Sequence, residues 1–341
     1  MTGPDPSPAP GRILLLGATG TIGRATLAAL LVRGHSVVCP VRPGSETGRG
    51  AVPEPGTGTG PDLPAGAILR HADVTDLDSL ARDGIRGERF DALVSCLASR
   101  TGAPADAWAV EHRAQSHALR LARDAGITRA VLLSAICVQK PLLEFQKAKR
   151  AFEDELMAAD LAWSIVRPTA FFKSLSGQVE RVRQGKPFLI FGDGRGTACK
   201  PISDADLADY IAGCLDDPER QNRILPIGGP GPALTPRDQA AILFELTGRP
   251  PRFRSVPVAL LDGIIATLSA LGRVAPRLRD KAEFARIGRY YATESMLVLD
   301  PATGRYSAEA TPEHGGDTLR DHYARLLRGE IADDRGAHAV F

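Results

Sequence analysis

The stretch RILLLGATGTIG, residues 12–23, decides the fold of this 341-residue chain. Its apolar first half predicts a buried strand that ends in a glycine loop, and a helix begins inside that loop. Gly17 permits a sharp turn, Gly20 lets backbone N–H groups approach a pyrophosphate, and Gly23 leaves room for close packing of helix and strand. The stretch therefore predicts a dinucleotide site, which comprises Gly17, Thr19, Gly20, Thr21, Ile22 and Gly23.

Strand-like runs alternate with helix-like runs through the first half of the chain. The expected strands are residues 13–16, 36–41, 67–71, 92–96, 130–133 and 163–166, and the expected helices are 22–33, 77–82, 105–125 and 142–158. Strands that are apolar nearly throughout and separated by helices predict a parallel sheet covered on both faces. The fold class is therefore α/β, a Rossmann-type doubly wound sheet. The G-x-x-G-x-x-G spacing resembles that of the short-chain dehydrogenase/reductase superfamily, in its atypical or extended branches.

The chain divides into a cofactor domain and a smaller lobe. We expect a disordered leader at 1–11, an NADP-binding Rossmann domain at 12–168, a mixed substrate-binding lobe with some return to the sheet at 169–328, and a tail at 329–341. Residues 43–66 are crowded with Gly, Pro and Thr, which predicts a mobile loop. An apolar helix is expected around 258–271; it could contact substrate, although plain core packing is the commoner explanation for such a stretch.

Composition excludes several classes of protein. A net charge of +2 without a basic run gives no reason to expect nucleic acid as a partner. Five scattered cysteines without a C-x-x-C pair argue against a metal site and against disulfides; Cys39 and Cys96 lie in apolar runs and are expected core thiols. No apolar segment is long enough to span a bilayer. We therefore expect a cytoplasmic protein. Peripheral attachment to a membrane stays open, but no amphipathic basic helix argues for it.

The residues that follow the second and third strands indicate the cofactor. NAD-selective sheets usually place an acidic residue after the second strand, whereas this chain has Arg42 and no acid nearby. A guanidinium there suits the 2′-phosphate of NADPH, although a solvated loop arginine is the alternative. Asp73 and Val74 resemble the superfamily's adenine-contacting turn, and Asp76 is expected to cap the next helix.

The chemistry depends on the segment that contains Phe145 and Lys149. Carbonyl-reducing members of the superfamily carry Tyr-x-x-x-Lys, in which the tyrosine donates a proton; here the lysine is present and the tyrosine is Phe145. On a helix, Phe145, Lys149 and Phe152 share one face, and a lysine in an apolar stripe is uncommon unless its ammonium group is paired or reaches a ligand. A snorkelling lysine is the alternative.

The upstream run also lacks a polar group. Where relatives often carry a catalytic serine, this chain has Ala135. Phenylalanine has no proton to give, so carbonyl reduction is disfavoured. The two losses indicate hydride delivery to a carbon–carbon double bond, or a binding protein that has abandoned catalysis.

Four longer runs carry a more specific resemblance. They are LLSAICVQKPLLEFQ at 132–146, VRPTAFFKSL at 166–175, CKPIS at 199–203 and PIGGPG at 226–231. Together they resemble the NADPH-dependent 8-vinyl reductases of chlorophyll and bacteriochlorophyll synthesis, over roughly residues 12–327. This resemblance implies reduction of a vinyl group to ethyl on a magnesium divinyl tetrapyrrole, chlorophyllide or protochlorophyllide, with a free propionate. The metal belongs to the substrate, and no protein metal site is expected.

The resemblance also implies roles for individual residues. Lys149 is the catalytic candidate: it would hold the nicotinamide ribose and supply or relay a proton. Tyr290 and Tyr291 are other possible acids, supported only by residue type. Further contacts to NADPH would come from Cys96, Leu97, Ala98, Pro168 and Thr169. The pigment would lie on Phe145, Phe171 and Phe172, for which core packing is the alternative, and its propionate would pair with Lys173 or Lys200.

Two other functions compete with this interpretation. A non-catalytic NADP(H) sensor of the NmrA-like type keeps the glycine loop and loses the acid. An alkene reductase that acts on another conjugated substrate, resembling the isoflavone reductase group, would also lack the tyrosine.

Overall fold

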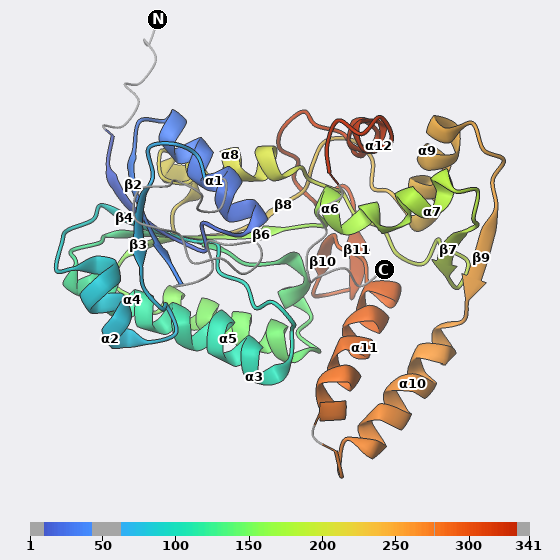
Figure 1. The fold of residues 1–341 in the computed structure, drawn as a ribbon, viewed down its shortest axis with the longest axis horizontal. Coiled ribbons are helices and arrows are strands. Elements are labelled where there is room, and N and C mark those ends of the chain that lie inside the picture. Colours follow the sequence, from blue (N-terminus) through green and yellow to red (C-terminus); the bar gives the residue numbers. More distant parts are fainter. Residues whose placement is uncertain (1–9, 43–62, 276, 333–341) are drawn as a thin grey trace, which may run out of the picture.

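Seven parallel strands form the central sheet in the order β3-β2-β1-β4-β5-β6-β8 (Figure 1). Their bounds are β1 Arg12–Leu16, β2 Ser36–Val41, β3 Ile68–His71, β4 Ala92–Ser95, β5 Arg129–Leu133, β6 Ala162–Pro168 and β8 Arg223–Ile227. The computed structural model describes residues 10–42, 63–275 and 277–332. Most of the leader expected at 1–11, of the loop expected at 43–66 and of the tail expected at 329–341 lies outside these ranges.

Helices cover both faces of the sheet, as Figure 1 shows. On one face, α1 (Thr21–Val32) and α8 (Asp204–Gly213) pack through Leu27, Leu30 and Ile211. The other face carries α4 (Gln115–Asp124) and α5 (Glu144–Met157). Four shorter helical segments come before α4 in the chain: α2 (Leu77–Ser79), η1 (Leu80–Ile85), α3 (Pro104–Ala107) and η2 (Trp108–Ala114). Strands apolar on both faces require this double cover, and the predicted Rossmann-type α/β fold is confirmed.

The residues after Pro168 contribute to the sheet and also build a second apolar cluster. They supply β8 and α8 to the sheet. The second cluster is formed by α6 (Phe172–Leu175), α7 (Val179–Arg183), β7 (Phe188–Phe191), α9 (Pro236–Thr247), β9 (Phe253–Val256) and α12 (Leu319–Leu327). Strands β7 and β9 pair in parallel, and β10 (Val298–Asp300) pairs with β11 (Arg305–Ser307) in an antiparallel hairpin. The domain boundary at 168/169 stays a prediction.

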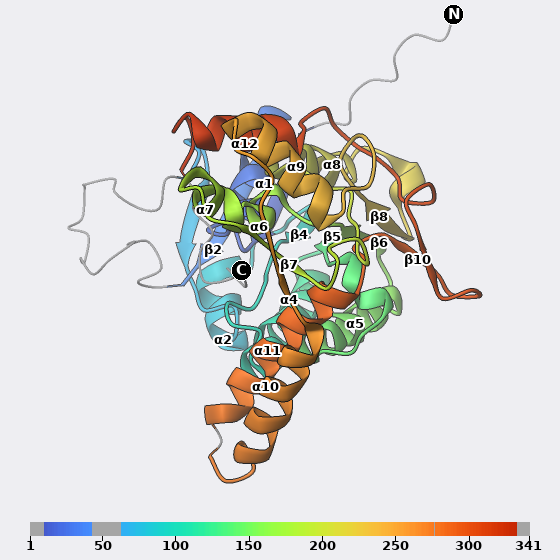
Figure 2. The ribbon, with the colours of Figure 1, turned by 90° about the vertical axis from the view of Figure 1, so that its right-hand side faces the viewer.

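A hairpin of two helices stands out from the rest of the molecule in both views (Figures 1 and 2). It consists of α10 (Val258–Leu271) and α11 (Arg277–Thr293). The C-terminal end of α11 is attached to the rest of the protein, because the Tyr290 hydroxyl donates to the Cys137 carbonyl at 3.0 Å. In contrast, α10 has no buried residue. The helix expected at 258–271 is therefore confirmed, and its interpretation as core is wrong. Among the described residues, no helix is long and apolar enough to cross a membrane.

Candidate active site

The loop between β1 and α1 requires glycine at two positions. Gly17 has φ +78°, and a Cβ there would lie 2.6 Å from the Cys96 carbonyl oxygen. A Cβ on Gly23 would lie 2.0 Å from the Gly17 carbonyl oxygen, so the helix can approach the loop only without a side chain. The sharp turn and the close packing expected from the sequence are both present. The backbone thus forms a cradle of the kind that a dinucleotide pyrophosphate occupies.

The first turn of α1 is an open anion site. Its N-cap is Gly20, no side chain caps the helix, and no acidic residue lies in the first turn. The N–H groups of that turn are therefore available to a phosphate at the positive helix end. Lys173 adds a cation, because its ammonium group donates to the Thr21 hydroxyl at 2.7 Å. The residues present therefore fit a dinucleotide, with Thr19 and Ile22 completing the loop.

Arg42 and Asp73 come together at the ends of neighbouring strands. Val41 pairs with His71 in the register of β2 and β3, so the residues that follow lie at one edge of the sheet. Desolvation raises the pKa of Asp73, but hydrogen bonds from Thr75 and the charge of Arg42 outweigh it, and the net pKa lies below its usual value. At this edge of the sheet, the Arg42 guanidinium could bind a 2′-phosphate. The neighbouring turn is stabilised by the Asp73 carboxylate, which accepts hydrogen bonds from Thr75. Val74 is buried, and Asp76 caps α2 as expected, by accepting from Asp78 and Ser79.

The loop after β4 lies at the point where strand order reverses, between β1 and β4. Open α/β sheets bind ligands at this reversal, outside the carboxyl ends of the strands. Cys96 and Leu97 are buried, and Ala98 is exposed. Burial raises the pKa of Cys96 to about 12, so its thiol stays protonated. Cys39 is buried as well, which confirms both expected core thiols.

Lys149 is buried and paired. Its ammonium nitrogen lies 2.7 Å from Glu111 Oε2, and the two side chains are 11% and 2% exposed. The other carboxylate oxygen, Oε1, accepts from the Ser99 amide and hydroxyl at 2.8 and 3.0 Å. The charge of Lys149 also reaches Cys96 and Cys137, since it opposes the burial that raises the pKa of both thiols. Lys149 therefore lies beneath the β4 loop, where the nicotinamide ribose is expected, and is not a snorkelling lysine.

Glu111 is the site residue that the sequence interpretation missed. It lies in η2, where the helix widens into π-type turns, a feature frequent at functional sites. Glu111, Gln115, Ala118 and Ala122 are all buried on one helix face. The signal was available, because a charged residue in an apolar stripe needs a partner, and that rule had singled out Lys149.

One of the three phenylalanines expected to hold pigment is buried in the protein core. Phe172 is buried among Val182, Phe188 and other residues of the second cluster, so it presents no surface to a ligand. Phe171 packs on the sheet core beside α8. Core packing, the alternative weighed for both, therefore describes Phe172, whereas Phe171 is half-buried and its pigment role stays a prediction. Phe145 is half-buried against the cluster that contains Cys137 and Tyr290, and its role stays a prediction.

The two lysines expected to meet a propionate have other partners. Lys173 lies at the glycine loop, as described above. Lys200 is buried, with its ammonium group 2.5 Å from Glu313 Oε1 and 3.2 Å from the Thr311 carbonyl. Both ammonium groups therefore have protein partners, and the propionate role expected of each residue stays a prediction.

The remaining predicted residues have structural partners. Pro168 and Thr169 are buried at the end of β6, where the Thr169 amide donates to the Ile227 carbonyl at 2.9 Å. The Tyr290 hydroxyl donates to the backbone carbonyls of Cys137 and Lys140, and its role as an acid stays a prediction. Desolvation around its hydroxyl, the largest cause, raises the pKa of Tyr291 well above its usual value, although the residue as a whole is 38% exposed. The position of the missing serine holds Ala135, which packs against the Cys137 cluster.

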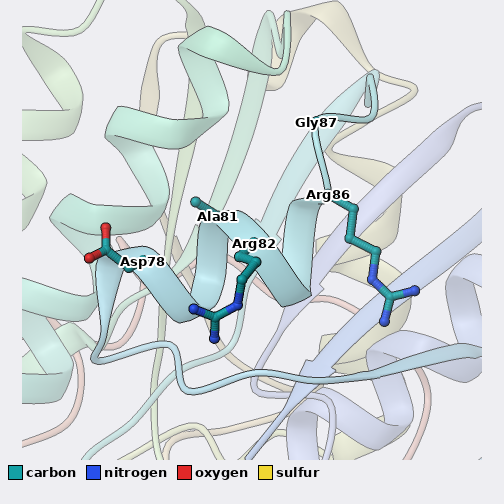
Figure 3. Close-up of a pocket in the computed structure, with 5 residues that line it drawn as sticks. All are labelled: Asp78, Ala81, Arg82, Arg86 and Gly87. Atoms are coloured by element: carbon teal, nitrogen blue, oxygen red, sulfur yellow. The ribbon is translucent and has the colours of Figure 1, made fainter.

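Two hollows mark the surface. One, lined by Asp78, Ala81, Arg82, Arg86 and Gly87, is shown in Figure 3. It includes none of the predicted cofactor residues, and Arg82 pairs there with Asp83. The other is a groove between the helical hairpin and the loop after β4, which we call the hairpin groove. Its lining residues are Thr101, Ala103, Ile264, Leu268, Asp280, Lys281, Phe284 and Ala285.

Known proteins resemble the chain over nearly its whole length. A family described as NAD(P)H-binding matches residues 17–218. The divinyl chlorophyllide a 8-vinyl-reductase of Oryza sativa subsp. indica is 50% identical, covering 98% of this chain and 83% of the relative. The protein of the same name from Arabidopsis thaliana is 48% identical over 96% of this chain and 79% of its own.

A solved structure shares the fold. An NADPH-dependent quinone oxidoreductase from Escherichia coli superimposes with a TM-score of 0.61 at 16% identity, covering 92% of this chain and 99% of that one. Identity this low shows the fold alone, whereas the plant relatives show the family. The chain therefore belongs to the family of divinyl chlorophyllide a 8-vinyl reductases.

Proposed function

We propose that this chain uses NADPH to reduce the 8-vinyl group of a divinyl chlorophyllide or protochlorophyllide a to ethyl. The observation that carries the proposal is the combination of Phe145 and Lys149 on α5, in a chain that shares its family with the plant 8-vinyl reductases. An alkene conjugated to a macrocycle needs no proton donor at a carbonyl oxygen. A phenylalanine at the tyrosine position therefore fits this substrate and disfavours a ketone.

NADPH, when bound, supplies the hydride. The first turn of α1 and Lys173 would hold its pyrophosphate, and Arg42 its 2′-phosphate. Lys149, oriented by Glu111, would hold the nicotinamide ribose. Rate enhancement then depends mainly on orientation and on exclusion of water, and the proton comes from a side chain or from water.

The hairpin groove is our proposed pigment site, in place of one that includes the buried Phe172. Thr101 lines the groove and lies two residues after Ser99 in the chain. Ser99 donates to Glu111, and Glu111 in turn pairs with Lys149, so the groove is connected to Lys149 through these contacts. Leu268 and Phe284 offer apolar surface to a flat macrocycle. Lys281 would pair with the propionate, since no ion pair among the described residues holds it; Asp280 also lines the groove.

Arg42→Ala is expected to lower the preference for NADPH over NADH by about tenfold to a hundredfold, the range for one lost charge-assisted hydrogen bond. The ratio of kcat/KM for the two cofactors measures this. Arg82→Ala is the matched control, because Arg82 is an exposed arginine held by Asp83. An unchanged ratio would mean that the phosphate is held by other residues.

Lys173→Met is expected to weaken the binding of NADPH and of NADH by the same factor, about tenfold, because the pyrophosphate is common to both cofactors. Fluorescence titration of each cofactor measures the two dissociation constants. This outcome separates Lys173 from Arg42, whose loss affects NADPH selectively. Lys186→Met, at an exposed lysine, is the control. Full affinity in Lys173→Met would place Lys173 outside the cofactor site.

The function itself is tested by incubating the purified chain with NADPH and divinyl chlorophyllide a. Reduction of the vinyl group shifts the Soret band of the pigment, and the monovinyl product is confirmed by mass. An unchanged spectrum beside tight NADPH binding would contradict the proposal and would favour the non-catalytic sensor.

A further inference from the structure

Helix α10 exposes an apolar surface along its whole length. Its sequence, VALLDGIIATLSAL, carries one charged residue in 14, and none of these residues is buried. Leu260 and Leu271 are 55% and 52% exposed, and Val274 in the following turn is 90% exposed. One side of α10 is half-buried against α11, and the other side leaves apolar side chains in solvent, which is unusual for so apolar a helix.

The turn and the start of α11 are basic. Arg273, Arg277, Arg279 and Lys281 follow the apolar helix, with Asp280 as the one acid among residues 271–281. Arg279 donates to the Gly272 carbonyl at 2.9 Å, whereas no described residue forms an ion pair with Arg273 or Arg277. The outer end of the hairpin thus combines exposed leucine and valine with unneutralised arginine.

We propose that the outer end of the α10–α11 hairpin docks on the surface of a bilayer that contains anionic lipids. Exposed apolar side chains enter the acyl boundary, and arginines contact phosphate headgroups, which is how interfacial helices bind. A 14-residue helix is about 21 Å long, short of the roughly 30 Å of a hydrocarbon core, so the hairpin lies at the interface and does not span it. Both views show the hairpin projecting away from the sheet, where a flat surface can reach it (Figures 1 and 2).

The charge pattern favours a membrane over a second copy of the chain. A symmetric contact centred on the outer end of the hairpin would bring the arginines of two copies together, and like charges in a contact are costly. An anionic lipid surface complements them. No single amphipathic basic helix is involved, because the apolar part lies on α10 and the basic part on the turn and α11.

The proposal does not rest on the proposed function, because vesicle binding is measured without pigment. The full chain is floated with vesicles of phosphatidylcholine alone or mixed with phosphatidylglycerol. We expect binding to the mixed vesicles, weakened at least about tenfold by Leu271→Asp with Val274→Asp. Arg273→Glu with Arg277→Glu should abolish the preference for anionic lipid. Val32→Asp is the matched control, because Val32 is 87% exposed on α1, away from the hairpin.

Three results would overturn the proposal. The first is no binding to either vesicle, and the second is full binding by the Leu271→Asp, Val274→Asp variant while it retains normal NADPH affinity. The third is a dimer in sedimentation velocity without lipid that this variant dissociates, which would assign the face to a second copy. Retained NADPH affinity shows that each variant is folded.

Discussion

Lys149→Met is expected to abolish turnover and to lower the free energy of unfolding by about 3–5 kcal/mol, because it leaves Glu111 as an uncompensated buried charge. The two effects must be separated, since an unfolded variant is inactive for a trivial reason. Glu111→Gln combined with Lys149→Met removes both charges, so the double variant should regain most of the stability and none of the activity. Urea unfolding and initial rates, measured on the same preparations, decide this.

The same helix provides the control for Lys149. Lys147 is an exposed lysine that pairs with Glu144 on the surface of α5. Lys147→Met should change the free energy of unfolding by less than about 1 kcal/mol and leave turnover unaltered. If the double variant at Glu111 and Lys149 were active, the ammonium group would have no part in the reaction. If Lys149→Met were fully stable, the pair would be more hydrated than its burial indicates.

Gly23→Ala is expected to reduce NADPH affinity at least about tenfold and to lower the melting temperature by several degrees. A Cβ there would lie 2.0 Å from the Gly17 carbonyl oxygen, a backbone atom that can yield only if the loop and α1 move apart. That movement displaces the N–H groups that would hold the pyrophosphate. Calorimetry with and without NADPH measures both effects.

Gly20→Ala separates steric exclusion from a general effect of alanine in the loop. A Cβ on Gly20 meets the same carbonyl oxygen at 3.4 Å, an ordinary contact, and the residue needs no positive φ. Its melting temperature without cofactor should therefore stay near that of the unaltered chain. Equal destabilisation by the two substitutions would contradict the steric explanation.

The cofactor half of the molecule was largely predictable from sequence. The strand–loop–helix at 12–32 and the apolar stripe around Lys149 are local patterns, in which neighbours along the chain decide the structure. The cap at Asp76 is local in the same way. Such features need no knowledge of the tertiary fold.

The substrate half was not predictable because its contacts are long-range. Lys200 and Glu313 are more than a hundred residues apart, and so are Lys173 and Thr21. No spacing rule connects such pairs, so a lysine in a distinctive run could not be assigned its partner. The face of α10 was misjudged for a related reason: an apolar helix has the same sequence pattern whether it is covered by protein or exposed.

The position of Lys173 has a consequence for nucleotide affinity. This lysine follows Phe172, which is anchored in the cluster around Val182 and Phe188, yet its amine reaches the start of α1. If Lys173 holds the pyrophosphate as proposed, loosening that distant cluster would move its ammonium group away from the cofactor. The affinity for the nucleotide then depends on how well this remote cluster is packed. By thermodynamic linkage, cofactor binding in turn stabilises the packed state of the cluster.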